Sequence, residues 1–210
     1  MLSKRRLHLV PGLRRNLLAR QKSLRMLFPR RSDEMTTVTH PIPPVWNSES
    51  KVLILGTMPS PKSREAGFFY MHPQNRFWSV MAEVFGESFK YPNNSSDHTA
   101  AIAERRDFLL RHHLAMWDVL ASCEITGAAD SSIKNAIPND FTKILENSQI
   151  HHIICTGKTA YNLWQKNCAA KYEPRYNLIA HCLPSTSPAN AQWSKEKLIE
   201  EYKIILKLFH

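Results

Sequence analysis

The sequence contains no apolar run that approaches the roughly 20 residues required to span a bilayer. We therefore expect a soluble protein that makes no contact with a membrane. The sequence also contains no internal repeat, so no repeat architecture is indicated. With 210 residues, of which 43% are hydrophobic, the chain is long enough for one sizeable core, and we expect one α/β domain.

Cysteine is scarce, and its spacing shows no metal-binding pattern. The four cysteines, Cys123, Cys155, Cys168 and Cys182, form no C-x-x-C pair. Zinc ions and iron–sulfur clusters are held by thiolates at short, regular spacings, so we expect no metal, no cluster and no other cofactor. Cys155 and Cys182 each lie in an apolar run, which favours reduced core thiols in a protein from a reducing compartment.

Acidic residues are almost missing from the start of the chain. Residues 1–34 hold 10 of the 28 Lys and Arg residues but 2 of the 18 Asp and Glu residues, so their formal net charge is +8, whereas residues 35–210 carry +2. Such an Arg-rich, acid-poor arm is typical of organelle-import peptides, and also of translated upstream stretches that precede a true start, here Met35. We expect residues 1–34 to be a disordered arm and residues 35–210 to form a single domain.

Three apolar runs of strand length are each followed by turn residues. They are KVLILG at residues 51–56, HHIIC at 151–155 and YNLIAHC at 176–182, and a weaker fourth candidate covers residues 114–120. Continuous rather than alternating apolarity is typical of strands that are buried on both faces of a parallel sheet. The proline-rich segment at residues 40–44 cannot be helical and is expected to be an extended lead-in.

Stretches with helical periodicity alternate with these strands. In residues 75–85, one apolar face is formed by Phe77, Trp78, Met81, Val84 and Phe85. The other expected helices cover residues 100–113, 140–147, 158–166 and 194–209. Strand–helix alternation predicts a three-layer α/β/α fold with a central, mainly parallel four-stranded sheet.

The long loop after the first strand carries groups that suit the binding of a nucleobase. Long loops in compact domains are usually functional. Residues 56–78 read GTMPSPKSREAGFFYMHPQNRFW, so three aromatic residues precede His72, Asn75 and Arg76. Aromatic rings beside amide and cationic groups suit stacking on a base and recognition of its edge. Asn75 can equally cap the following helix, and His72 can be a hydrogen-bonded part of the loop.

The loop after the last strand is uncharged. Residues 183–190 read LPSTSPAN and offer hydroxyls, small side chains and two prolines. A rigid loop of this kind can enter a DNA groove and contact phosphates through hydroxyls and amides, although by itself it is also an ordinary Ser/Pro turn. Because ligands bind at the carboxyl ends of parallel strands, we expect both loops to face one crevice.

Together, the two loops resemble the motifs of a known enzyme superfamily. The string at residues 56–78 resembles the first motif of the uracil-DNA glycosylase superfamily, in particular of the mismatch-specific uracil/thymine glycosylases and of the hypoxanthine-DNA (deoxyinosine) glycosylase family. The string at residues 183–190 resembles the second motif of the hypoxanthine family, and WDVLASCEITGAADSSI at residues 117–133 is also similar to that family. The resemblance covers about residues 50–207, and H-P-x-N-R-F-W is its most specific part.

Two polar groups that related glycosylases use are missing. In the mismatch-specific branch, an Asn before the first proline of the motif positions the attacking water, and Met58 stands at that position here. Leu183 stands where the second motif of ordinary uracil glycosylases begins with His. The hypoxanthine family shows the same absence, and there the Asn of H-P-x-N-R-F-W is essential, which implies that Asn75 is catalytic. Tyr70 matches the aromatic residue that stacks on the flipped base.

The resemblance also implies binding roles for other residues of the two loops. Contacts with the base are expected from Thr57, Met58, Ser60, Tyr70 and His72. Contacts with DNA are expected from Lys62, Arg76, Pro184, Ser185, Thr186, Ser187 and Asn190. No Lys stands where a Schiff-base nucleophile is indicated, which favours a monofunctional enzyme that leaves an abasic site uncut.

The function expected is that of a monomeric DNA-deoxyinosine glycosylase, which flips hypoxanthine out of damaged DNA and hydrolyses its N-glycosidic bond to begin base excision repair. Its expected location is the cytoplasm, near a bacterial nucleoid, with organelle import through the arm as the alternative. Three other interpretations stay open. The enzyme can act on uracil or thymine mismatches, the chain can be a non-catalytic nucleic-acid-binding module, and Asp118 can be the carboxylate that activates water.

Overall fold

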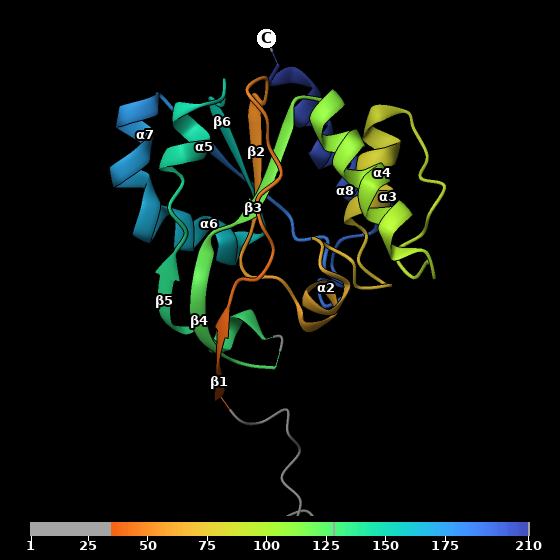
Figure 1. Ribbon diagram of the computed structural model, residues 1–210, viewed down its shortest axis with the longest axis horizontal. Helices are drawn as coiled ribbons and strands as arrows, with labels where there is room; N and C mark the ends of the chain where they lie inside the picture. Colours follow the sequence, from red (N-terminus) through yellow and green to blue (C-terminus); the bar gives the residue numbers. More distant parts are fainter. Residues whose placement is uncertain (1–34, 128, 210) are drawn as a thin grey trace, which may run out of the picture.

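A four-stranded parallel sheet forms the centre of the molecule (Figure 1). The computed structural model describes residues 35–127 and 129–209, so the predicted basic arm lies outside the described residues, and the domain boundary at residue 35 stays a prediction. The strands are β2 (Val52–Gly56), β3 (Leu114–Asp118), β6 (His152–Thr156) and β7 (Ile179–Leu183), in the order β3-β2-β6-β7. The predicted sheet is therefore confirmed.

Helices cover both faces of this sheet, because its central strands are apolar on both sides. Val52 and Ile54 of β2 pack into one core with α3 (Phe77–Phe85), α4 (His98–Arg111) and α8 (Lys195–Tyr202). Leu53 and Leu55 pack into a second core with α5 (Thr142–Glu146), α6 (Lys158–Trp164) and α7 (Ala170–Tyr176). Figure 1 shows the two helical layers on opposite sides of the strands. The predicted three-layer α/β/α fold is confirmed.

Two predicted boundaries differ from the structure around the last strand. The helix expected to end near residue 166 continues from α6 through a π-helical turn, Gln165–Ala169, into α7. Asn177 ends α7 with a φ of 50°, so β7 begins at Ile179 rather than at Tyr176. After α8, the chain continues directly into the 3-10 helix η3 (Lys203–Lys207).

One expectation about the thiols was wrong. Cys155 is buried on the central strand β6, but Cys182 is exposed. Cys182 lies on β7, the edge strand of the sheet, and its apolar neighbours in the sequence therefore do not place it in the core.

A second, antiparallel sheet adjoins the carboxyl ends of the parallel strands and was not predicted. Its strands are β1 (Met35–Thr39), β4 (Leu120–Thr126) and β5 (Lys134–Pro138), in the order β1-β4-β5. A single residue, Val119, separates β3 from β4, so the chain passes directly from one sheet into the other. All residues of β1 and β5 are exposed or half-buried, which explains why no apolar run marks them.

The loop after β2 contains a short helix that was expected to be irregular. Helix α2 (Pro61–Ala66) begins after Ser60, whose hydroxyl accepts a hydrogen bond from the Ser63 backbone N–H at 3.2 Å. It ends at Gly67, which has a φ of 72°. None of the helices in residues 35–127 and 129–209 is both long and apolar enough to cross a membrane.

Candidate active site

A cleft with a volume of about 620 Å³ opens at the carboxyl ends of the parallel strands. Two of its walls come from loop one, residues 57–76, and from loop two, residues 184–190, and a third comes from the connection between β4 and β5. Parallel strands place the loops that follow them at one edge of the sheet. The cleft accordingly brings together four predicted residues from the two loops: Met58, Tyr70, Asn75 and Ser185.

Gly56 ends β2 at the floor of the cleft, where no larger residue fits. A Cβ atom at this position would lie 2.2 Å from the Asp118 Oδ1 atom and 3.0 Å from the Tyr70 hydroxyl. Glycine therefore allows a carboxylate and a phenol to approach the strand end from the two neighbouring segments.

Tyr70 is held rigidly beside this floor. Its ring stacks on Phe77 with the ring centres 4.1 Å apart, so only the opposite ring face is left for a base. The Thr156 hydroxyl donates to the Leu55 carbonyl at 3.1 Å, so it accepts the 2.7 Å hydrogen bond from the Tyr70 hydroxyl. Burial, and then the charge of Asp118, raises the pKa of the Tyr70 phenol well above its usual range, which keeps the phenol neutral.

Asp118 is a buried carboxylate at the end of β3. Its Oδ2 atom lies 2.8 Å from the Nε2 atom of His40, and both side chains are at most 5% exposed. The Ile42 backbone N–H donates to the Nδ1 atom of His40 at 3.2 Å, so the imidazole proton lies on Nε2 and is donated to Asp118. The second carboxylate oxygen faces Gly56 on the cleft floor.

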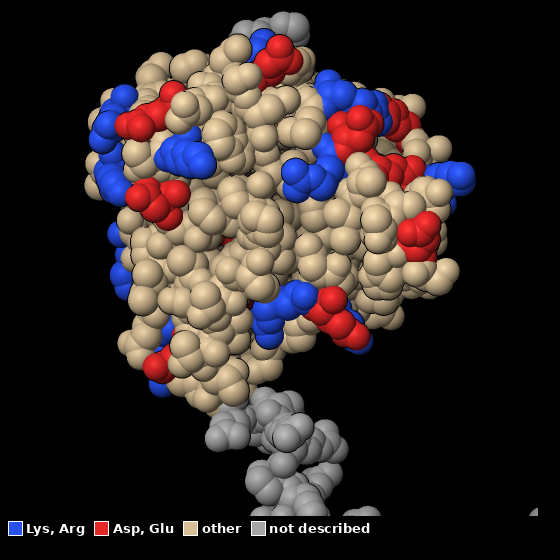
Figure 2. Space-filling model, viewed as in Figure 1, with Lys and Arg blue, Asp and Glu red and all other residues tan. Residues whose placement is uncertain are grey.

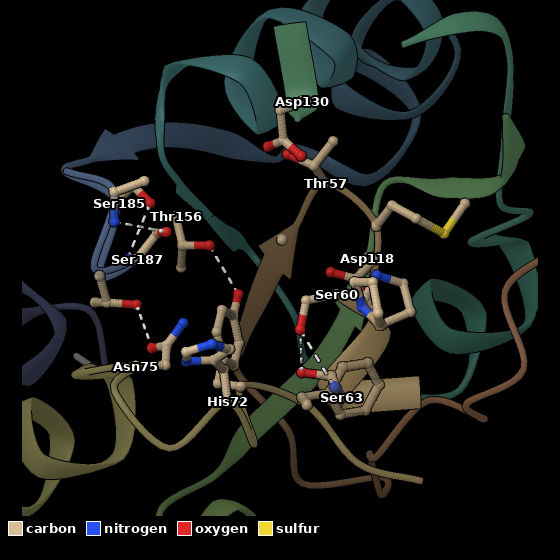
Figure 3. A pocket seen from close by; sticks show the side chains of 18 of the residues that line it. Thr57, Ser60, Ser63, His72, Asn75, Asp118, Asp130, Thr156, Ser185 and Ser187 are labelled. Carbon is tan, nitrogen blue, oxygen red and sulfur yellow. Dashed lines mark hydrogen bonds between the residues drawn. The ribbon is translucent and has the colours of Figure 1, made fainter. Parts of the chain in front are cut away.

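Asn75 lies at the end of loop one, just before α3. Its side-chain carbonyl accepts hydrogen bonds from the Phe77 backbone N–H at 2.9 Å and from the Thr186 hydroxyl at 3.0 Å. Asn75 is not the N-cap of α3, because that position is held by Arg76, which makes no side-chain capping hydrogen bond. The Asn75 oxygen nevertheless satisfies the N–H of Phe77, the first residue of α3. The side-chain nitrogen remains available, and Figure 3 shows it on the side of the amide that faces the cleft.

Arg76 holds loop two in place. Its side chain donates to the backbone carbonyls of Thr186 at 3.3 Å, Ser187 at 2.8 Å and Asn190 at 3.1 Å, and also to that of Trp193. Because these carbonyls accept hydrogen bonds from the guanidinium, Arg76 orders the loop that was predicted to contact DNA. A direct contact between Arg76 and DNA stays a prediction.

The other predicted residues fall into two groups. Within the cleft lie Thr57, Ser60, His72, Thr186, Ser187 and Asn190. Lys62 and Pro184 do not line it, and Lys62 forms an exposed ion pair with Glu65 on α2. The Nδ1 atom of His72 accepts from the Gln74 backbone N–H at 3.2 Å, in agreement with a loop-stabilising role. The predicted contacts of these residues with a base or with DNA stay predictions.

Sequence reasoning missed Asp130 and Thr156, which also line the cleft. Asp130 begins the 3-10 helix η1 (Asp130–Ser132) at the cleft mouth, beside Thr57 (Figure 3). Desolvation by the surrounding walls raises the pKa of its carboxyl, the Thr57 hydroxyl opposes this shift, and the charge of Asp118 adds to it. Thr156 ends β6, which lies between the strands that carry loop one and loop two, so the strand-end rule could have found it.

Charge is mixed on the face of the molecule that Figure 2 shows. Figure 2 shows Lys and Arg side chains interspersed with Asp and Glu on the face in view, without a continuous basic surface. Among residues 35–127 and 129–209, no three His, Cys, Asp or Glu side chains are grouped so that they could hold a metal ion.

Gly56→Ala should destabilise the protein by about 2–3 kcal/mol, because the added methyl group overlaps a buried carboxylate that His40 holds in place. Denaturant unfolding measures the effect. Gly67→Ala is the matched control, since its φ of 72° disfavours alanine while nothing lies within 4 Å of the new methyl group. The control should cost about 1 kcal/mol, and equal losses for both variants would contradict the steric explanation.

Comparison with known proteins connects this cleft to a family. The model of the uracil DNA glycosylase superfamily matches residues 43–208. A hypoxanthine DNA glycosylase from Methanosarcina acetivorans is 27% identical over 158 residues, which cover 74% of this chain and 90% of that protein. A second hypoxanthine DNA glycosylase, from Methanosarcina barkeri, is 26% identical over 159 residues with the same two coverages.

A solved structure shows the same fold. The solution NMR structure of a Methanosarcina acetivorans protein, assigned provisionally as a uracil DNA glycosylase, has a TM-score of 0.63 and 23% identity. The match covers 83% of this chain and 100% of that one. The family match spans the parallel sheet, both helical layers and both loops of the cleft. The chain therefore belongs to the uracil DNA glycosylase superfamily.

Proposed function

We propose that this protein is a monofunctional glycosylase that releases hypoxanthine from deoxyinosine in damaged DNA. The observation that carries the proposal is the Asn75 amide, fixed at the wall of a cleft to which Met58 brings no polar group, while Leu183 is buried in the core. The two hypoxanthine DNA glycosylases to which the chain is similar support this choice of base.

Features of the cleft support the successive steps of base excision. A glycosylase first turns its target nucleotide out of the duplex, which costs a few kcal/mol and least at a mispair. The ring face of Tyr70 opposite Phe77 would stack on the flipped purine, a contact worth about 1–3 kcal/mol. Loop two would fill the space that the base leaves, because its Pro188 and Ala189 lie at the cleft and its backbone is held by Arg76.

Cleavage of the glycosidic bond leaves positive charge on the sugar and negative charge on the departing base. A preorganised donor directed at that negative charge lowers the barrier by about 3–4 kcal/mol. The Asn75 side-chain N–H groups would be such donors. Lys62, the nearest lysine of loop one, lies in an exposed ion pair outside the cleft, which supports hydrolysis without a Schiff base.

A base-release panel tests the proposed function. Duplexes that contain hypoxanthine, xanthine, uracil or a thymine mispair are incubated with excess enzyme, and abasic sites are cut with alkali. We expect hypoxanthine to be released fastest and strands to break only after the alkali step. Faster release of uracil or thymine would make the protein a mismatch glycosylase, and no release from any duplex would favour a non-catalytic nucleic-acid-binding module.

A further inference from the structure

The Asn75 side-chain carbonyl has no capacity left to accept a further hydrogen bond. An amide oxygen carries two acceptor lone pairs. One receives the Phe77 backbone N–H at 2.9 Å, and the other receives the Thr186 hydroxyl at 3.0 Å. The amide can therefore offer the cleft only its two N–H donors.

This geometry decides between two roles for the amide. To activate a water molecule for attack, a side chain must accept a hydrogen bond from an O–H group of that water. To stabilise a departing base, a side chain must donate to the growing negative charge. With both lone pairs of the oxygen occupied, Asn75 is equipped for the second role.

We propose that Asn75 acts on the departing base rather than on the attacking water, and that Thr186 is the positioning residue that enforces this role. The inference rests on the proposed glycosylase function. In the reaction, the C1′–N9 bond breaks and its electron pair goes to the base, where the Asn75 N–H groups stabilise it. Water adds to C1′ of the sugar cation and loses one proton, and a proton neutralises the released base.

Thr186 is suited to fix the amide. Thr186 is 1% exposed, so its hydroxyl is shielded from competing water. A hydroxyl that donates to an amide oxygen also polarises the amide and makes its N–H groups better donors. The Arg76 side chain and its backbone N–H both donate to the Thr186 carbonyl, at 3.3 and 3.2 Å, so the position of loop two sets the position of the hydroxyl.

The first experiment changes the charge on the leaving base. Single-turnover release is measured from duplexes that contain hypoxanthine or 7-methylhypoxanthine, with the enzyme-free rate subtracted. The methylated base carries a positive charge before cleavage and departs uncharged, so a donor gains little from it. Asn75→Ala should slow hypoxanthine release by about 100-fold but slow release of the methylated base by less than about tenfold. Equal losses on both substrates would overturn the inference, because a role on water does not depend on the leaving base.

The second experiment tests Thr186 through Asn75. Thr186→Val keeps the shape and removes the hydroxyl, and should lower the single-turnover rate about tenfold. Thr186→Ser should restore most of the rate. In the Asn75→Ala background, Thr186→Val should have no further effect. The matched control is Thr142→Val. Thr142 lies on α5, away from the cleft, and its exposed hydroxyl donates a hydrogen bond to Asp140.

The outcomes separate this inference from the proposed function. A wild-type protein that releases no base disproves the glycosylase proposal, and the role of Asn75 fails with it. If the wild type is active but Thr186→Val lowers the rate equally with and without Asn75, Thr186 shapes the loop alone. The side-chain amide ¹⁵N resonance of Asn75, identified by its loss in Asn75→Ala, gives an independent check. It should shift in Thr186→Val and stay in place in Thr186→Ser.

Discussion

Asn75→Ala should slow hypoxanthine release by about 100-fold or more while the protein still folds, because the variant loses the donor that faces the departing base. The Phe77 N–H loses its acceptor as well, so a loss of stability of about 1 kcal/mol is expected. Single-turnover release and thermal unfolding measure the two effects separately.

Two further substitutions at this position separate chemistry from capping. Asn75→Asp keeps oxygens that can accept from the Phe77 N–H and the Thr186 hydroxyl, but it replaces the donors with a negative charge. Asn75→Ser also keeps an oxygen that can accept from the start of α3. Both variants should melt near the wild-type temperature and lose most of the activity. Full activity in Asn75→Ser would reduce Asn75 to a cap and move the search to Asp118 and His72.

Arg76→Met should lower the free energy of unfolding by at least about 3 kcal/mol, because several charge-assisted hydrogen bonds to loop two are lost together. Base release should fall by about 100-fold, since Thr186 and the residues after it lose their support next to Asn75. Urea unfolding and single-turnover release measure the two effects. Arg76→Lys should be intermediate, because an ammonium group cannot match the planar fork of a guanidinium.

Arg106→Met is the matched control, since Arg106 is an exposed arginine on α4. It should change stability by less than about 0.5 kcal/mol. If Arg76 instead contacts a DNA phosphate directly, a different result is expected. It would leave the stability of Arg76→Met unchanged and reduce the salt dependence of DNA binding by about one counterion. That result would restore the role that the sequence suggested for Arg76.

The strands β2, β3 and β6 of the parallel sheet were predictable from sequence because they are buried on both faces and therefore read as continuous apolar runs. The edge strand β7 is partly exposed and was found from its apolar residues alone. The antiparallel sheet was not, because β1 and β5 are mostly exposed and have no apolar run. Helix α2 was missed for another reason. It is six residues long, and its beginning depends on the Ser60 cap and its end on Gly67 rather than on an apolar face.

The site was predictable where its residues lie in the loops that follow the parallel strands. Asn75, Tyr70 and the residues of loop two could be assigned to one crevice in this way. The pair of His40 and Asp118 could not be found, because the two residues are 78 positions apart and His40 lies in a lead-in with no periodic pattern. The role of Arg76 could not be found either, because its partners are backbone carbonyls, which every residue has.

The contact of Arg76 with main-chain oxygens of loop two has an evolutionary consequence. Arg76 contacts loop two through main-chain oxygens, so its hold does not depend on the side chains at positions 187, 190 and 193. Arg76 therefore places no constraint on those side chains, although the Asn190 side chain supports the loop separately through a 2.9 Å hydrogen bond to the Ser185 carbonyl, and Trp193 packs against the core. Thr186 differs, because the role proposed for it requires its own hydroxyl. Drift in this loop should therefore be tolerated where a side chain makes no contact that holds the loop, and selected against at Thr186, which contacts Asn75.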